Sequence, residues 1–318
     1  MFQNKSIGVV IPCYKVKKQI LRVLDKMVPE VDVIYVVDDK CPENSGDFVK
    51  ENITDSRVKV LYNDVNKGVG GAVIHGYKQA LADGIDIVVK LDGDDQMDAD
   101  LILPLIKPIV EGKADYRKGN RFYFPKSLSA MPAIRLFGNG ALSFINKFVN
   151  GYWHVMDPTN GFTAIHRSAL SLLELEKLNE RYFFESDMLY RLAIQRAVVQ
   201  DFAMHAKYAD EESNLSVTRV LFDFPPKYCA RFFKRLIYMY FLRDINLGSF
   251  HLVSGLILLI FGLAFGGSNW YTNAINDVVT PTGTVMISVV SVILGIQLLL
   301  AFLNYDVSNR PQSPNQDQ

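Results

Sequence analysis

Two uncharged stretches near the C-terminus place the strongest constraint on what this chain can fold into. Residues 247–267 and 284–303 contain no Asp, Glu, Lys or Arg. As a helix, the first stretch would extend about 32 Å, close to the hydrocarbon thickness of a bilayer. Both stretches are therefore predicted to be transmembrane helices. The alternative is a pair of buried helices in a large soluble domain.

The segments around these spans predict their orientation. Residues 225–246 mix aromatic side chains with five cations, Lys227, Arg231, Lys234, Arg235 and Arg243. This mixture is typical of an amphipathic helix at a membrane interface. The loop 268–283 contains no Lys or Arg, so the positive-inside rule places both termini in the cytoplasm. The polar residues 304–318 are expected to form a disordered cytoplasmic tail.

Residues 1–224 have the pattern of an α/β domain. Apolar strands predicted at 7–11, 33–37, 58–61 and 85–89 alternate with segments of helical periodicity. Such alternation predicts a mostly parallel sheet with right-handed crossovers. In sheets of this kind, ligands bind beyond the carboxyl ends of the strands.

The fourth predicted strand leads into four aspartates, Asp92, Asp94, Asp95 and Asp98. Carboxylates this close together repel one another unless a cation lies among them. Oxygen ligands suit Mg²⁺ or Mn²⁺, and Mg²⁺ usually binds one or two carboxylates together with substrate phosphates. A solvated acidic turn is the alternative. The sequence predicts a metal–diphosphate site at Asp92, Gly93, Asp94 and Gln96.

The other three strands also end in residues suited to a polar ligand: Pro12-Cys13-Tyr14, Asp38-Asp39, and the loop 63–71 with Lys67 and Gly68. Together with the acidic cluster, they favour a nucleotide diphosphate bound with a metal. The loop lacks both the full spacing of a dinucleotide fingerprint and the Lys-Ser/Thr pair of a P-loop. Its glycines either contact phosphate or only permit the turn into the next helix.

The middle of the chain carries further candidates. Arg121, Lys126 and Arg135 are either phosphate ligands, because guanidinium forks match phosphate oxygens, or ordinary surface charges. Asp157 begins a turn-rich stretch and is either catalytic or a turn cap. Competing catalytic candidates lie at the N-terminus of a predicted helix, where carboxylates are also favoured on structural grounds alone: Glu185 and Asp187.

Composition excludes some classes of protein. Lys plus Arg and Asp plus Glu balance at 34 each, which gives no support for a nucleic-acid partner. The three cysteines lie far apart and indicate neither a zinc site nor a disulfide framework. No signal peptide is visible, so the N-terminal domain is expected in the cytoplasm. A nucleotide–metal site tethered to a membrane suits a nucleotide-sugar donor and a lipid acceptor.

Five motifs, taken in order, resemble glycosyltransferase family 2: Val9-Val10-Ile11-Pro12-Cys13-Tyr14, Val36-Val37-Asp38-Asp39, Asn66-Lys67-Gly68, Leu91-Asp92-Gly93-Asp94-Asp95-Gln96 and Asp157-Pro158-Thr159-Asn160-Gly161-Phe162. Within this family the chain is similar to the polyprenyl-phosphate glycosyltransferases, namely bactoprenol glucosyltransferases and dolichol-phosphate mannose synthases. The resemblance covers essentially the whole chain. It implies a Rossmann-like nucleotide-sugar (type A) fold and an inverting transfer.

The resemblance also implies roles for individual residues. The nucleotide sugar would be held by Pro12, Tyr14, Asp38, Asp39, Lys67, Gly68, Asp92 and Gly93. The metal and diphosphate would be held by Asp92, Asp94 and Gln96. The catalytic set would be Asp94, Asp157 on the acceptor side, and Arg121 and Arg135 at the acceptor phosphate. Lys15-Val16 stands where the family usually has Asn-Glu, which leaves the nucleotide base open.

The implied reaction transfers glucose from UDP-glucose to undecaprenyl phosphate on the cytoplasmic side of the inner membrane. The enzyme is expected to be a homo-oligomer. A phosphate acceptor is already anionic, so the reaction needs no strong general base. GDP-mannose is an alternative donor. A processive synthase is disfavoured because neither Trp153 nor Trp270 lies in a Gln-x-x-Arg-Trp motif. A non-catalytic membrane partner with a vestigial transferase domain is a further alternative.

Overall fold

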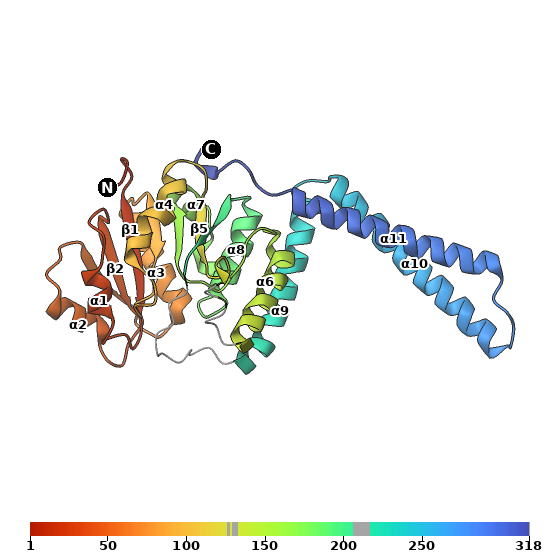
Figure 1. Ribbon diagram of the computed structural model, residues 1–318, viewed down its shortest axis with the longest axis horizontal. Coiled ribbons are helices and arrows are strands. Elements are labelled where there is room, and N and C mark those ends of the chain that lie inside the picture. Colours follow the sequence, from red (N-terminus) through yellow and green to blue (C-terminus); the bar gives the residue numbers. More distant parts are fainter. Residues whose placement is uncertain (126–127, 129–132, 206–216, 318) are drawn as a thin grey trace. The chain divides into compact units, whose positions relative to one another are not determined.

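A computed structural model describes residues 1–125, 128, 133–205 and 217–317. The chain divides into two compact units, which are described separately. The first comprises Met1–Phe232 together with Pro311–Gln318, and the second comprises Phe233–Arg310. Figure 1 shows the sheet and helices of the first unit and the long helical hairpin of the second.

Within the described residues, the first unit contains a seven-stranded sheet of order β3-β2-β1-β4-β6-β5-β7. The strands are β1 Ile7–Cys13, β2 Val33–Asp38, β3 Val58–Tyr62, β4 Ile87–Lys90, β5 Tyr116–Asn120, β6 Thr163–His166 and β7 Val199–Ala203. Strands β1 to β4 are parallel, whereas β6 runs antiparallel to its neighbours β4 and β5. The predicted mostly parallel α/β fold is confirmed.

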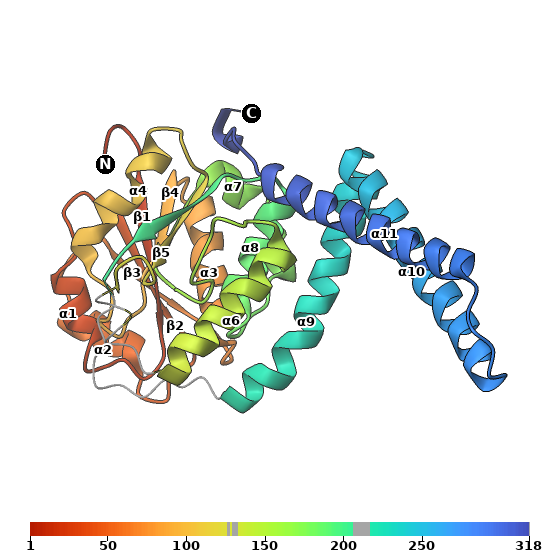
Figure 2. The same cartoon turned by 45° about the vertical axis from the view of Figure 1, so that its right-hand side comes forward.

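Helices cover both faces of this sheet (Figure 2). The side chains of Val9 and Val10 are fully buried in different clusters, because successive residues of a strand point to opposite faces. The cluster around Val10 includes residues of α3 Gly68–Ala82, α7 Arg167–Ser171 and α8 Phe184–Ile194. The cluster around Val9 includes residues of α1 Ile20–Asp25, α2 Ser45–Asn52 and α4 Ile102–Val110.

The residues on both sides of the predicted 224/225 boundary belong to one helix. Pro225 and Pro226 lie inside α9 Val217–Ile237, which runs beside α6 Ala133–Asn150 in Figures 1 and 2. Phe224 and Tyr228 are buried against Phe183, with ring centroids 5.1 and 5.0 Å away. This aromatic cluster attaches the first part of the predicted interfacial segment to the rest of the first unit.

Residues of the C-terminal segment make defined contacts with the rest of the first unit. The last long helix continues to Ser308, and the backbone N–H of Asn315 donates to Asp115 Oδ1 at 2.8 Å. Asp115 is fully buried and also accepts from the Val198 N–H at 2.7 Å. The disordered tail over 304–318 stays a prediction from polar composition, which carries no information on such hydrogen bonds.

The second unit contains two helices long and apolar enough to cross a membrane, α10 Leu247–Ile275 and α11 Thr282–Ser308. Both extend beyond the predicted spans 247–267 and 284–303. Glycines allow their close packing: a Cβ added to Gly295 would lie 2.7 Å from Leu259 N. In the same unit, Arg235 Nη1 pairs with the buried Asp306 Oδ1 at 2.7 Å.

Candidate active site

The carboxyl ends of the first four strands meet at one edge of the sheet. Cys13 is in register with Asp38, and Val10 with Lys90, so the segments that follow these strands begin side by side. Gly93 lies against the first strand, because an added Cβ would be 3.4 Å from the carbonyl oxygen of Pro12. The fold thus brings together three predicted elements: the Pro12 turn, the Asp38-Asp39 pair and the acidic cluster.

Asp38 is buried and holds the backbone that follows its strand. Its carboxylate accepts from the N–H groups of Cys41 and Gly46, each at 2.7 Å. These contacts fix the loop that leads into α2. Asp38 therefore shapes this edge of the sheet from within, whereas Tyr14 is 45% exposed and open to a ligand.

Asp39 organises the glycine loop. Its carboxylate accepts from the backbone N–H groups of Lys67 at 2.9 Å and Gly68 at 2.7 Å. It also accepts from Asn63 Nδ2 at 2.8 Å. Asp39 thus satisfies donors at the start of α3, where backbone N–H groups lack helical partners. Any contact from Lys67 to a nucleotide would have to come from its ammonium group.

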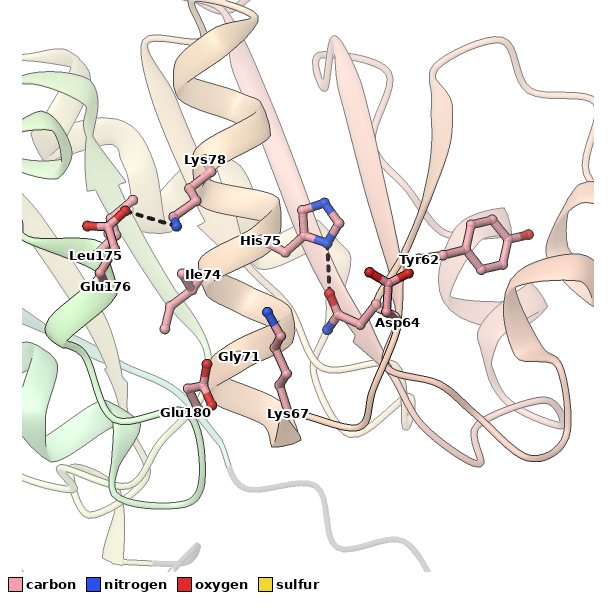
Figure 3. Close-up of a pocket in the computed structure, with 11 residues that line it drawn as sticks. Tyr62, Asp64, Lys67, Gly71, Ile74, His75, Lys78, Leu175, Glu176 and Glu180 are labelled. Atoms are coloured by element: carbon pink, nitrogen blue, oxygen red, sulfur yellow. Dashed lines mark hydrogen bonds and ion pairs between the residues drawn. The ribbon is translucent and has the colours of Figure 1, made fainter.

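A pocket of about 330 Å³ lies beside this loop, between β3, α3 and residues 175–180 (Figure 3). Lys67 and His75 line it, and His75 Nδ1 is 2.8 Å from Asn63 Oδ1. Burial, together with the nearby Lys67 and Lys78 ammonium groups, lowers the pKa of His75. The acidic cluster contributes no residue to its lining. The pocket is therefore separate from the predicted metal site.

The acidic cluster contains a charged partner that sequence reasoning missed. Lys90 Nζ lies 2.8 Å from Asp92 Oδ1 and 3.2 Å from Glu185 Oε1. Burial opposes the charge of Lys90, but these two carboxylates raise the pKa of its ammonium group above the usual value. Burial raises the pKa of Glu185, and Lys90 opposes that shift. In the sequence, the signal for this ion pair is Lys90 itself, a charged residue at the end of an apolar strand.

The neighbouring aspartates have different environments. Asp94 Oδ1 accepts from the Gln96 N–H at 3.1 Å, which closes the turn. Asp95 instead pairs with Lys26 at 2.7 Å and Arg22 at 3.4 Å. Asp95 also has a left-handed backbone, with φ of 62°. Its carboxylate is therefore paired with Arg22 of helix α1 and with Lys26, the residue that follows this helix.

The acidic strand end contains the kinds of donor atom with which a divalent cation is held together with phosphate. Among the residues described, no three or more His, Cys, Asp and Glu side chains are grouped so that they could hold a metal alone. Asp92, Asp94 and Gln96 offer two carboxylates and an amide oxygen at one strand end. Mg²⁺ and Mn²⁺ are commonly held by such partial sets together with substrate oxygens.

Asp157 is bound to Arg121 through a two-pronged ion pair. Arg121 Nε lies 2.7 Å from Asp157 Oδ2, and Nη2 lies 2.8 Å from Oδ1. Asp157 is fully buried, and Asn160 Nδ2 donates to it at 3.2 Å. Burial would raise the pKa of Asp157, but the Arg121 guanidinium outweighs it and lowers the pKa. This carboxylate is arranged to hold Arg121 in place, and its bound oxygens are poorly suited to accept a proton.

The loop after Asp157 lies directly beside the acidic cluster. A Cβ added to Gly161 would come within 2.4 Å of both Asp92 Oδ2 and Lys90 Nζ. Lys118 Nζ holds the backbone at the start of this loop and donates to the carbonyl oxygens of Met156 at 2.7 Å and Asp157 at 2.5 Å. A side chain at 161 would displace the charged ends of Asp92 and Lys90. The motif at 157–162 and the motif at 91–96 therefore lie next to each other in the fold.

Of the remaining candidates, Asp187 has a described side chain, whereas Arg135 and Lys126 do not. Asp187 is fully buried and pairs with Arg231 at 2.6 Å and Arg191 at 3.2 Å, so it joins α8 to α9. Arg135 lies in the first turn of α6, and its side chain falls outside the described part of the structure. Lys126 is outside the described residues as well.

A mostly parallel α/β sheet with acidic residues at a strand end is typical of the type A glycosyltransferase fold. Residues 8–173 match glycosyl transferase family 2, which is more than half of the chain. The chain belongs to this family and is a glycosyltransferase. The family and fold predicted from the motifs are confirmed.

Named relatives and solved structures agree with this assignment. A UDP-N-acetylglucosamine–dolichyl-phosphate N-acetylglucosaminyltransferase of Methanococcus voltae is 34% identical over 193 residues, covering 56% of this chain and 76% of the relative. An undecaprenyl-phosphate mannosyltransferase of Micrococcus luteus is 29% identical, covering 58% and 76%.

The fold also matches glucosyl-3-phosphoglycerate synthase of Mycobacterium tuberculosis, solved with Mn²⁺ and UDP-glucose. That match has a TM-score of 0.52 and 19% identity, covering 73% of this chain and 80% of the other.

Proposed function

We propose that this protein transfers a sugar from a nucleoside diphosphate donor to a polyprenyl phosphate at the membrane surface, with inversion. The observation that carries the proposal is the union, in one chain, of a family 2 domain and two helices apolar enough to cross a membrane. Relatives of that domain are named as dolichyl- and undecaprenyl-phosphate transferases. Two membrane-spanning helices would keep the transferase domain close to a lipid acceptor.

The donor is proposed to be a uridine diphosphate sugar. UDP-glucose was favoured by the resemblance of the motifs, and the neighbouring solved structure contains it. The 34% identical relative is named for UDP-N-acetylglucosamine, which makes this donor an equal candidate. GDP-mannose is the third candidate, because the Micrococcus luteus relative is named a mannosyltransferase. The pair Lys15-Val16, which stands where the family usually has Asn-Glu, leaves the nucleotide base open.

Each residue of the site has a proposed task. Asp92, Asp94 and Gln96 hold Mg²⁺ or Mn²⁺, which neutralises the leaving nucleoside diphosphate. Arg121, held by Asp157 through two hydrogen bonds, presents a fixed guanidinium to the acceptor phosphate. Because that phosphate is already anionic, orientation and charge supply most of the rate. Asp157 acts by positioning Arg121.

The proposed location is the inner membrane, with both termini and the transferase domain in the cytoplasm. The support is the charge pattern: cations are concentrated in residues 225–246, whereas residues 268–283 between the two spans contain no Lys or Arg. A homo-oligomer stays a prediction.

The test is a donor panel. Membranes containing the protein are incubated with polyprenyl phosphate and labelled UDP-glucose, UDP-N-acetylglucosamine or GDP-mannose. One donor is expected to move label into the organic phase, and membranes without the protein are the control. Donor binding without any lipid-linked label would contradict the proposal and favour a vestigial, non-catalytic domain.

A further inference from the structure

A buried ammonium group lies behind the acidic strand end. Lys90 is the last residue of β4, and its side chain is 1% exposed. It contacts Asp92 Oδ1 at 2.8 Å and, from α8, Glu185 Oε1 at 3.2 Å. Burying an ion is unfavourable unless its partners compensate for the lost hydration. A lysine here therefore depends on both carboxylates.

The surroundings leave this cluster little freedom. Gly161 is so close that an added Cβ would lie 2.4 Å from both Lys90 Nζ and Asp92 Oδ2. Strand β6 pairs Thr163 with Lys90, which fixes the backbone on this side. The Glu185 side chain is 11% exposed and Asp92 is 27% exposed. Of the three, Asp92 is the one that reaches solvent, and the other two lie behind it.

We infer that Lys90 and Glu185 are positioning residues that orient the Asp92 carboxylate and set the charge of the cation site. The inference deepens the proposed function and rests on it. Lys90 binds one Asp92 oxygen and so fixes the direction of the carboxylate. Glu185 shares the ammonium group and so limits how strongly Lys90 competes with a metal for Asp92. When all three are ionised, Lys90, Asp92 and Glu185 together carry one net negative charge.

The first test is Glu185→Gln, which keeps the shape of the side chain. Without its second carboxylate, Lys90 should hold Asp92 more strongly, and a metal should bind less well. We expect the affinity for Mn²⁺, measured by spin resonance on the full-length protein with UDP or GDP, to fall about tenfold, the size of one charge-assisted contact. An unchanged Mn²⁺ affinity, with only a lower thermal midpoint, would overturn the inference.

The second test separates positioning from stability. Lys90→Met leaves two buried carboxylates without their cation and should lower the thermal midpoint strongly. In Lys90→Met/Glu185→Met the midpoint should return toward that of the wild type, because apolar residues often replace a buried ion pair without loss. In both variants, Mn²⁺ affinity and kcat should be lower than in the wild type, because Asp92 has lost the ammonium group that orients its carboxylate. Recovery of all three properties would show that the pair is purely structural.

Lys59→Met is the matched control, because Lys59 is a strand lysine paired with Asp83 at 2.7 Å and half exposed. It should change none of these properties. A wild-type protein that binds Mn²⁺ with a nucleotide but glycosylates no lipid would refute the proposed function. The comparison of Mn²⁺ affinities would still decide the role of Lys90 and Glu185.

Discussion

Asp94→Asn should nearly abolish sugar transfer, lowering kcat/KM by at least about 1,000-fold while the protein stays folded. The substitution keeps the size of the side chain and removes one of the two carboxylates proposed to hold the divalent cation. The lost charge acts where the leaving diphosphate develops its own negative charge. Transfer to polyprenyl phosphate and the thermal midpoint are the two measurements.

The same turn supplies a matched control. Asp95 is the next residue, but its carboxylate pairs with Lys26 and Arg22. Asp95→Asn removes the same charge, and asparagine tolerates the left-handed backbone at this position. Transfer by this variant should stay within about threefold of the wild type, as for a surface ion pair. Equal losses at Asp94 and Asp95 would mean that net acidity, and not a specific metal site, is what matters.

Asp157→Asn should reduce transfer by at least about 100-fold and destabilise the fold by about 3–5 kcal/mol, because it breaks a buried ion pair. The guanidinium of Arg121 would lose the partner that fixes it through two hydrogen bonds. The control is Asp187→Asn, since Asp187 is equally buried and paired with Arg231 and Arg191. This control should lose comparable stability but keep its turnover per folded molecule.

The pH dependence separates positioning from base catalysis. Arg121 lowers the pKa of Asp157 in the folded state, so the stability contributed by the ionised carboxylate is fully present above the usual aspartate range. It is lost only as the pH falls below about 3.9 and through the lowered pKa. The acid limb of the pH–rate profile between pH 5 and 8 should therefore be the same in the wild type and Asp157→Asn. Its disappearance in the variant would identify Asp157 as a base.

The sequence predicted the features that depend on local pattern. Buried strands followed by Pro12, Asp38-Asp39 and Asp92 to Gln96 predicted a parallel sheet whose ends converge, and the structure has this arrangement. The two long apolar stretches predicted helices that could span a membrane, which the structure contains. Hydrophobic periodicity is a local property, so one sequence suffices to predict the strands and helices that it marks.

Features that depend on distant partners were not predicted. Lys90 and Glu185 are 95 positions apart and meet only because α8 packs beside β4. The backbone N–H of Asn315 donates to Asp115, which lies 200 positions earlier in the chain. The sequence left Asp157 as either catalytic or a turn cap, and it gave no sign of the two hydrogen bonds from Arg121. Each case requires knowledge of which side chains meet in three dimensions, and hydrophobic periodicity carries no such information.

The most direct test of the account is the metal dependence of lipid glycosylation. Membranes containing the protein would receive labelled donor and polyprenyl phosphate, first with excess chelator and then with Mn²⁺ or Mg²⁺ restored. The account predicts that label in the organic phase disappears in chelator and returns with the metal. Undiminished lipid glycosylation in chelator would contradict the cation site at Asp92 and Asp94.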